Sequence, residues 1–128
     1  MPRLLAVLAL TALLGACAVP TNVGIRAADG ATIVLSPGQT ANLANGGAVR
    51  YVRLVNDSRC PPNVQCVWAG DAVIALNWVP ASGASRDLQL HFNAATGPNH
   101  ADLNGRRVAF TALSREGAQA SLLVTPAP

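Results

Sequence analysis

The chain has 128 residues, of which 51% are hydrophobic and 12% charged, and its net charge is +3. This length allows one domain with a single core. Every basic residue is an arginine, and apart from Arg106 and Arg107 the arginines are scattered along the chain. A nucleic-acid-binding protein usually carries a basic patch or stripe, so no nucleic-acid partner is expected.

The first sixteen residues have the layout of an export signal. Arg3 supplies a positive charge, residues 4–14 form an apolar run, and Gly15 and Ala16 are small residues in front of Cys17. The run is too short to span a bilayer as a helix of the mature protein. We therefore predict that residues 1–16 are a signal peptide that is cleaved from the mature chain.

The cysteine after this segment distinguishes a lipoprotein from an ordinary secreted protein, which is the alternative. The string Leu-Gly-Ala-Cys that ends at Cys17 resembles the lipobox of bacterial lipoproteins. The resemblance implies a lipid on Cys17, a tether over residues 17–22 and a membrane partner reached through the lipid anchor, because two or more acyl chains hold a protein stably on a bilayer. Ala18, where an aspartate would signal retention in the inner membrane of enterobacteria, favours the outer membrane, facing the periplasm.

Lipidation of Cys17 leaves two further cysteines, Cys60 and Cys66. Disulfides persist in exported proteins, and an odd thiol is left over unless one cysteine serves another purpose. A zinc site would need additional Cys or His residues close by in the sequence, and none is there. We predict a disulfide between Cys60 and Cys66, with no metal and no cofactor.

The remaining chain, residues 23–126, alternates short apolar stretches with turn-forming pairs such as Asp29-Gly30 and Asn104-Gly105. Many short strands at near-regular spacing predict an all-β domain, an immunoglobulin-like β-sandwich of seven or eight strands. The strands are expected over residues 23–27, 31–36, 39–43, 48–55, 67–79, 87–92, 107–113 and 118–125. The last stretch could instead be helical, because it is rich in alanine.

The expected strand over residues 67–79 has the clearest period of two. Its inward face would carry the apolar side chains Trp68, Ile74, Leu76 and Trp78. Asp71 would point outward. We predict that both tryptophans anchor the core and bind no ligand. In the strand over residues 87–92, Phe92 is expected on the inward face and His91 on the outward one.

Residues 57–70 read DSRCPPNVQCVWAG and form the most informative segment of the chain. A disulfide would close a seven-residue ring worth roughly 2.4 kcal/mol in the chain-entropy model, and two prolines stiffen it further. Binding residues often lie on loops that a rigid scaffold positions. The polar candidates for such contacts are Asp57, Ser58, Arg59, Asn63 and Gln65.

The string Asp-Ser-Arg-Cys-Pro, four residues, Cys-Val-Trp-Ala-Gly resembles the signature of a family of uncharacterised small bacterial exported proteins, many of them lipoproteins. Residues 35–39 resemble the strand and turn that commonly precede it. The chain departs from this family in a shortened region between Phe110 and Ala120. The resemblance implies an all-β domain and no established activity.

Several interpretations of the loop remain open. In a purely structural one, Asp57 and Arg59 bind each other or the loop backbone, and Trp68 caps the core. In the second, the loop belongs to a non-catalytic binding module whose partner is an envelope protein or a glycan. In the third, the loop inhibits a proteinase, which an exposed backbone at residues 63–65 would allow.

An enzyme is not expected. His91 and His100 are the only histidines, lysine is absent, and no sequence motif of a hydrolase, metalloprotease or phosphate-binding loop occurs. A metal site formed by His91, His100 and Asp102 is conceivable from the His-x-Asp spacing, although a solvated loop is the expected arrangement around His100.

Overall fold

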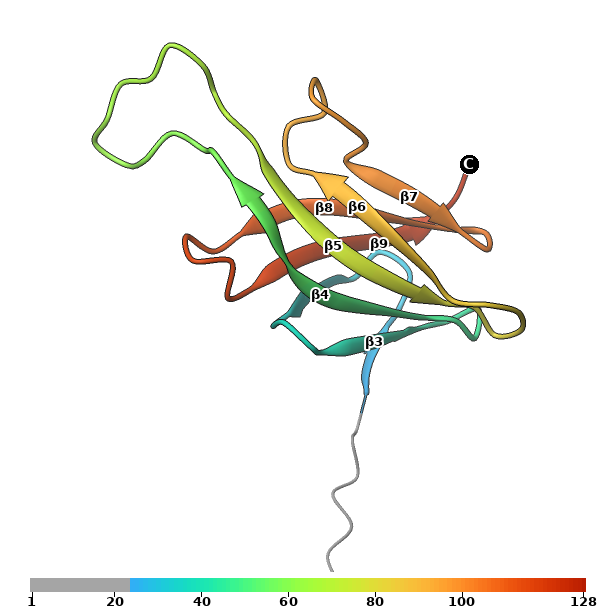
Figure 1. The fold of residues 1–128 in the computed structure, drawn as a ribbon. Coiled ribbons are helices and arrows are strands. Elements are labelled where there is room, and N and C mark those ends of the chain that lie inside the picture. The colour runs from blue at the N-terminus through green and yellow to red at the C-terminus, as the bar shows by residue number, and fades with distance from the viewer. Residues whose placement is uncertain (1–23) are drawn as a thin grey trace, which may run out of the picture.

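A computed structural model describes residues 24–128. The predicted signal peptide, Cys17 and the tether over residues 17–22 lie outside the described residues. Within residues 24–128 no helix is long and apolar enough to cross a membrane. Figure 1 shows that the described chain is built of strands in two layers. The strands are β1 (Ile25–Ala27), β2 (Thr32–Leu35), β3 (Thr40–Leu43), β4 (Ala48–Asp57), β5 (Ala72–Val79), β6 (Arg86–His91), β7 (His100–Leu103), β8 (Arg106–Leu113) and β9 (Ala120–Pro126).

The two layers are a five-stranded sheet, in the order β1-β3-β4-β5-β6, and a four-stranded sheet, in the order β2-β9-β8-β7. Strands β3 to β6 pair in succession as antiparallel neighbours, and so do β7 to β9. β1 adds to the first sheet parallel to β3. The predicted all-β sandwich is confirmed. It has nine strands in the described region, ordered as two meanders, whereas an immunoglobulin domain uses Greek-key connections.

The core lies between the sheets and follows the period of two in each strand. β9 buries Ala120, Leu122 and Val124 and leaves the residues between them partly exposed. β5 contributes the predicted row that ends at Trp78, which is only 5% exposed. Removal of these apolar rows from water is the main term that offsets the conformational entropy lost on folding.

β5 begins at Ala72, later than the sequence pattern suggests, and Trp68 is not a core residue. The backbone turns at Gly70, which has a φ of +70°, and the ladder with β4 ends at the pair Asp57 and Ala72. The residues before this turn lie outside the sheet. The alternation of apolar and polar residues in the sequence therefore does not indicate which of them face the core. Trp68 is consequently 83% exposed.

Other strand ends also differ from the sequence prediction. β6 ends at His91, so the predicted inward residue Phe92 lies beyond it and is 42% exposed, with its ring edge-to-face on Phe110. β7 lies in a stretch where the sequence predicted a loop. Only one of its four residues, Leu103, is buried, so the stretch has no apolar alternation that would indicate a strand. The helical alternative for residues 118–125 is wrong, since β9 pairs with both β2 and β8.

A buried tyrosine joins the two layers. Tyr51, in β4, is fully buried and its hydroxyl donates a hydrogen bond of 2.8 Å to the carbonyl of Gly117. Gly117 lies in the turn between β8 and β9, at a φ of +67° that favours glycine. Burial raises the pKa of Tyr51, so the phenol remains a neutral donor. This bond fixes the β8–β9 turn against the five-stranded sheet.

Replacement of this tyrosine tests the contact. We expect Tyr51→Phe to lower the free energy of unfolding by about 1–2 kcal/mol, because the buried Gly117 carbonyl loses its donor, and to lower the melting temperature by about 5 °C or more. Thermal unfolding followed by circular dichroism measures the change. Thr111→Val is the matched control, since it removes an exposed hydroxyl bonded to the Ser121 carbonyl, and we expect it to stay within about 0.5 kcal/mol. Equal effects of the two variants would contradict the assignment.

Candidate functional site

Three loops meet at one end of the sandwich. They are the β4–β5 loop (residues 58–71), the β6–β7 loop (residues 92–99) and the β8–β9 loop (residues 114–119). In Figure 1 the β4–β5 loop, drawn in green to yellow, projects well beyond the sheets. We call this end of the molecule the loop end.

The base of the β4–β5 loop is closed by the first residue after β4 and the last before β5. The Ser58 amide donates to the Asp71 carbonyl at 2.7 Å, and the Asp71 amide donates to Ser58 Oγ at 3.0 Å. Gly70 is required beside them, because a Cβ there would lie 1.9 Å from the Ser58 carbonyl oxygen. Ser58 therefore closes the base of the loop through its hydrogen bonds with Asp71.

Arg59 ties the loop to the opposite sheet. Its guanidinium donates two hydrogen bonds to the Asp57 carboxylate, Nε to Oδ1 at 2.8 Å and Nη2 to Oδ2 at 2.6 Å. Nη1 also donates to the Leu113 carbonyl at 2.9 Å, and Nη2 to the Ser114 carbonyl at 3.1 Å. The hydrogen bond from Arg59 holds the pKa of Asp57 below its usual value. We call this group of contacts the Arg59 clasp.

The outer part of the loop contains the predicted disulfide, which is present between Cys60 and Cys66 with a Cα–Cα distance of 5.8 Å. Within the ring the Val64 amide donates to the Pro61 carbonyl at 3.4 Å, and Asn63 has a φ of +63°. Asn63 and Gln65 are exposed. The ring is a compact turn that stands clear of the sheet.

Besides these two polar residues, the loop exposes large apolar side chains and no charged ones. Val64, Val67 and Trp68 are 55%, 92% and 83% exposed, and residues 60–70 contain no Asp, Glu, Lys or Arg. We call these three residues the loop tip. Large apolar side chains that are held in water on a stapled loop are typical of contact surfaces, so the tip is the first candidate binding feature.

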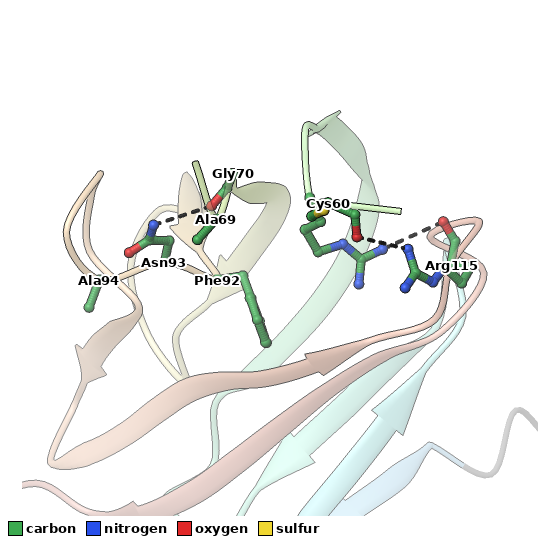
Figure 2. Close-up of a pocket in the computed structure, with 8 residues that line it drawn as sticks. Cys60, Ala69, Gly70, Phe92, Asn93, Ala94 and Arg115 are labelled. Carbon is green, nitrogen blue, oxygen red and sulfur yellow. Dashed lines mark hydrogen bonds between the residues drawn. The ribbon is translucent and has the colours of Figure 1, made fainter. Parts of the chain in front are cut away.

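Behind the tip the three loops surround an open pocket of about 440 Å³. Figure 2 shows Phe92 on one side of it and Arg115 on the other. Asn93 Nδ2 donates to the Gly70 carbonyl at 3.2 Å, and Arg115 Nη1 donates to the Cys60 carbonyl at 3.4 Å. The lining residues are Arg59, Cys60, Ala69, Gly70, Phe92, Asn93, Ala94 and Arg115. The pocket is mostly apolar, with a cationic edge at Arg115.

Asp71 is the one buried charged residue of the described chain and organises the β6–β7 loop. Its carboxylate accepts from the Asn93 amide at 2.8 Å and from the Thr96 hydroxyl at 2.6 Å, and it lies 2.6 Å from His91 Nδ1. Burial raises the pKa of Asp71, but the hydrogen bonds from Thr96, Asn93 and His91 outweigh burial and hold this pKa below its usual value.

The Thr96, His91 and Asp71 side chains do not have the arrangement of a catalytic triad. In such a triad the carboxylate and the nucleophile bind opposite nitrogens of the imidazole. Here the Thr96 hydroxyl approaches the carboxylate and lies 3.3 Å from the same nitrogen, Nδ1. The cluster is a polar brace for the loop.

The metal site conceivable from sequence is not assembled. His91 binds Asp71, whereas Asp102 accepts two hydrogen bonds from Arg107 at 2.8 and 3.0 Å. Among residues 24–128, no group of three or more His, Cys, Asp or Glu side chains could hold a metal ion.

The predicted contact residues thus divide into two groups. Asp57, Ser58 and Arg59 are engaged in holding the loop, while Asn63 and Gln65 are exposed on its ring. Sequence reasoning missed the apolar tip, because it assigned Trp68 to the core. The absence of charge from residue 60 to residue 70 was the signal that could have revealed it.

Comparisons with protein-family models, with curated proteins and with solved structures give no match.

The lowered pKa of Asp71 makes stability depend on pH. The unfolded carboxyl has a pKa of about 3.9, and the folded value is lower, so the stabilisation is present above pH 4 and is lost as the pH falls through the folded pKa. We expect Asp71→Asn to lower the melting temperature at pH 7 and to flatten its decline between pH 5 and 2. Thermal unfolding scans at several pH values measure the melting temperature of both proteins. Asp87→Asn, an exposed carboxylate, should keep the wild-type profile; a wild-type profile for Asp71→Asn would contradict the argument.

Proposed function

We propose that the chain is a lipid-anchored protein of the bacterial cell envelope whose loop end is a non-catalytic interaction module. The observation that carries this proposal is the loop tip, where Val67 and Trp68 stand in water on a loop fixed by a disulfide and the Arg59 clasp. Tryptophan is enriched among the residues that dominate binding energy, and a rigid loop loses little entropy on binding.

The polar groups of the loop end support an interaction over a reaction. The Arg59 guanidinium and the Asp71 carboxylate each bind several groups of the protein itself. Neither is free to activate a nucleophile or to transfer a proton to a substrate without breaking these bonds. The apolar tip also favours an apolar partner over a glycan, which needs several polar contacts.

Inhibition of a proteinase is the weaker alternative. The exposed ring at residues 63–65 leaves it open, because the backbone does not lie on the sheet. A substrate-like inhibitor would present an extended strand to the cleft of the proteinase, since peptides that bind along an edge do so in the extended form. The left-handed φ of Asn63 makes the ring a turn, which disfavours that mode.

The lipid anchor is tested by labelling. Cells that express the full chain and grow with labelled palmitate should transfer the label to the wild-type protein and not to Cys17→Ser, because only a lipidated cysteine carries the acyl chains. Cys60→Ser/Cys66→Ser is the control and should keep the label. Label on Cys17→Ser, or none on the wild type, would exclude the anchor.

The contact at the loop tip is tested by crosslinking in intact cells. A photoreactive phenylalanine analogue in place of Trp68 should crosslink to another envelope component, protein or lipid, because this side chain is held outside the fold. The same analogue in place of Val34, which is 45% exposed on β2, is the control. Equal crosslinking from the two positions, or none from either, would show that the tip is not a contact surface.

A further inference from the structure

The arginines that form no ion pair are distributed unevenly between the two sheets. Arg59 pairs with Asp57, Arg106 with Asp29 and Arg107 with Asp102, at distances of 2.6 to 2.8 Å. The arginines that form no such pair within residues 24–128 are Arg26, Arg50, Arg53, Arg86 and Arg115. Most of them belong to strands of the five-stranded sheet.

The register places three of these arginines on the outer face of that sheet. Arg26 lies beside Asn42, Arg50 beside Asn77 and Arg53 beside Ala75, and all three arginines are exposed. A bulge after Tyr51 turns Arg53 outward, as Arg50 is. These positions span the face from the edge strand β1 to the centre of the sheet, and we call the three residues the arginine face.

Negative charge on this face is sparse. Among the described strands of the five-stranded sheet, Asp87 is exposed beside Asn77 and accepts its side-chain hydrogen bond at 2.7 Å. Asp57, at the end of β4, is neutralised by Arg59. The face therefore carries net positive charge, whereas three of the five other arginines within residues 24–128 are paired with carboxylates.

The loop tip extends from the same sheet. β4 runs from Arg50 to Asp57 and continues directly into the β4–β5 loop, which projects beyond the sheet in Figure 1. The loop exposes Val64, Val67 and Trp68, and residues 60–70 carry no charged side chain. Tryptophan is enriched where a membrane meets water, because its ring is apolar while its N–H can bind water or headgroups.

The proposed anchor also leaves from this sheet. Cys17 precedes Gly24 by seven residues, which span at most about 25 Å. Gly24 adjoins β1, whose residue Ile25 lies beside Ala41 and hence close to the level of Arg50. Asp57 is seven residues along β4 from Arg50, or about 23 Å away. The proposed anchor, the arginine face and the loop tip thus all belong to the five-stranded sheet or to chain segments that continue directly from its strands.

We infer that the partner of the loop tip is the bilayer itself: Val64, Val67 and Trp68 insert into the interface of an anionic membrane while Arg26, Arg50 and Arg53 face its lipid phosphates. Arginine suits this role because its planar guanidinium binds phosphate in a bidentate manner. The inference deepens the proposed function, on which it rests for the position of the anchor, by giving the interaction module a lipid surface as its partner.

The test uses the chain without its lipid, so that failure of the anchor does not affect the result. All nine strands lie within residues 25–126, so the chain from Ala18 onward keeps the whole sandwich. Vesicles of phosphatidylethanolamine and phosphatidylglycerol, in a ratio of about 3 to 1, should bind this protein and shift its tryptophan emission to the blue, because Trp68 leaves water whereas Trp78 is already buried. Vesicles of phosphatidylcholine alone should bind it more weakly.

Matched variants separate the two parts of the contact. Val67→Ser/Trp68→Ser should lower the partition coefficient at least about tenfold and remove the blue shift. Val34→Ser, which changes a valine of the opposite sheet that is 45% exposed, should change neither. Arg50→Gln/Arg53→Gln should remove the preference for anionic vesicles. Arg86→Gln/Arg107→Gln lowers the net charge by the same amount but at positions outside the arginine face. This variant should keep the preference for anionic vesicles.

Three outcomes would overturn the inference. One is the absence of vesicle binding by a chain that unfolds cooperatively. Another is an equal loss in the Val34 control. The third is a crosslink from position 68 to a protein together with no binding to vesicles, which would leave the proposed function standing with a protein as its partner. If the wild-type protein takes up no labelled palmitate but the lipid-free chain binds vesicles, the anchor is excluded and the membrane contact stands.

Discussion

The Arg59 guanidinium holds the loop end of this protein together. It lies just beyond β4, in the five-stranded sheet, and donates to carbonyls at the end of β8, in the four-stranded sheet. Leu113 forms the last pair of the β8–β9 ladder and Ser114 follows it. The Ser114 carbonyl also accepts from the Gly117 amide, so loss of Arg59 would remove one donor from each of two half-buried carbonyls. Asp57 supplies the opposing charge and orients the guanidinium as a bidentate partner. Because one side chain reaches both layers, the long loop cannot swing independently of the sandwich.

This arrangement reverses the usual division between polar and apolar side chains. The charged residues of the loop motif point back into the fold, and the valines and the tryptophan point into water. Burial of Trp68 against the sheet would have been the ordinary outcome for so large an apolar side chain. The chain turns at Gly70, between Trp68 and the start of β5, and the Cys60–Cys66 disulfide closes the loop on the other side of the tryptophan. The exposure of the tip is thus imposed by the residues that make the loop rigid.

Sequence reasoning succeeded where a local pattern and the tertiary structure agree. The period of two in β5 located the core residues Ile74, Leu76 and Trp78, and the turn-forming pairs located most strand ends. The Cys60–Cys66 disulfide followed from counting cysteines. The pattern failed at Trp68, because an apolar alternation does not reveal that the backbone leaves the sheet. The contacts of Asp71 with His91 and Thr96 were also out of reach, since they join segments twenty and more residues apart.

The anchor and the loop tip would bind the membrane with different strengths. Acyl chains on Cys17 would retain the protein at the membrane, since two or more chains bind stably. Three small insertions of the size of Val64, Val67 and Trp68 could not do so alone. A tethered contact, however, benefits from an effective concentration in the millimolar range for a short flexible linker. A tip that binds a membrane only weakly from solution would therefore be largely occupied once the lipid is in place. Its effect would be orientation: the five-stranded sheet would lie toward the bilayer, and the four-stranded sheet with its paired arginines would face the periplasm.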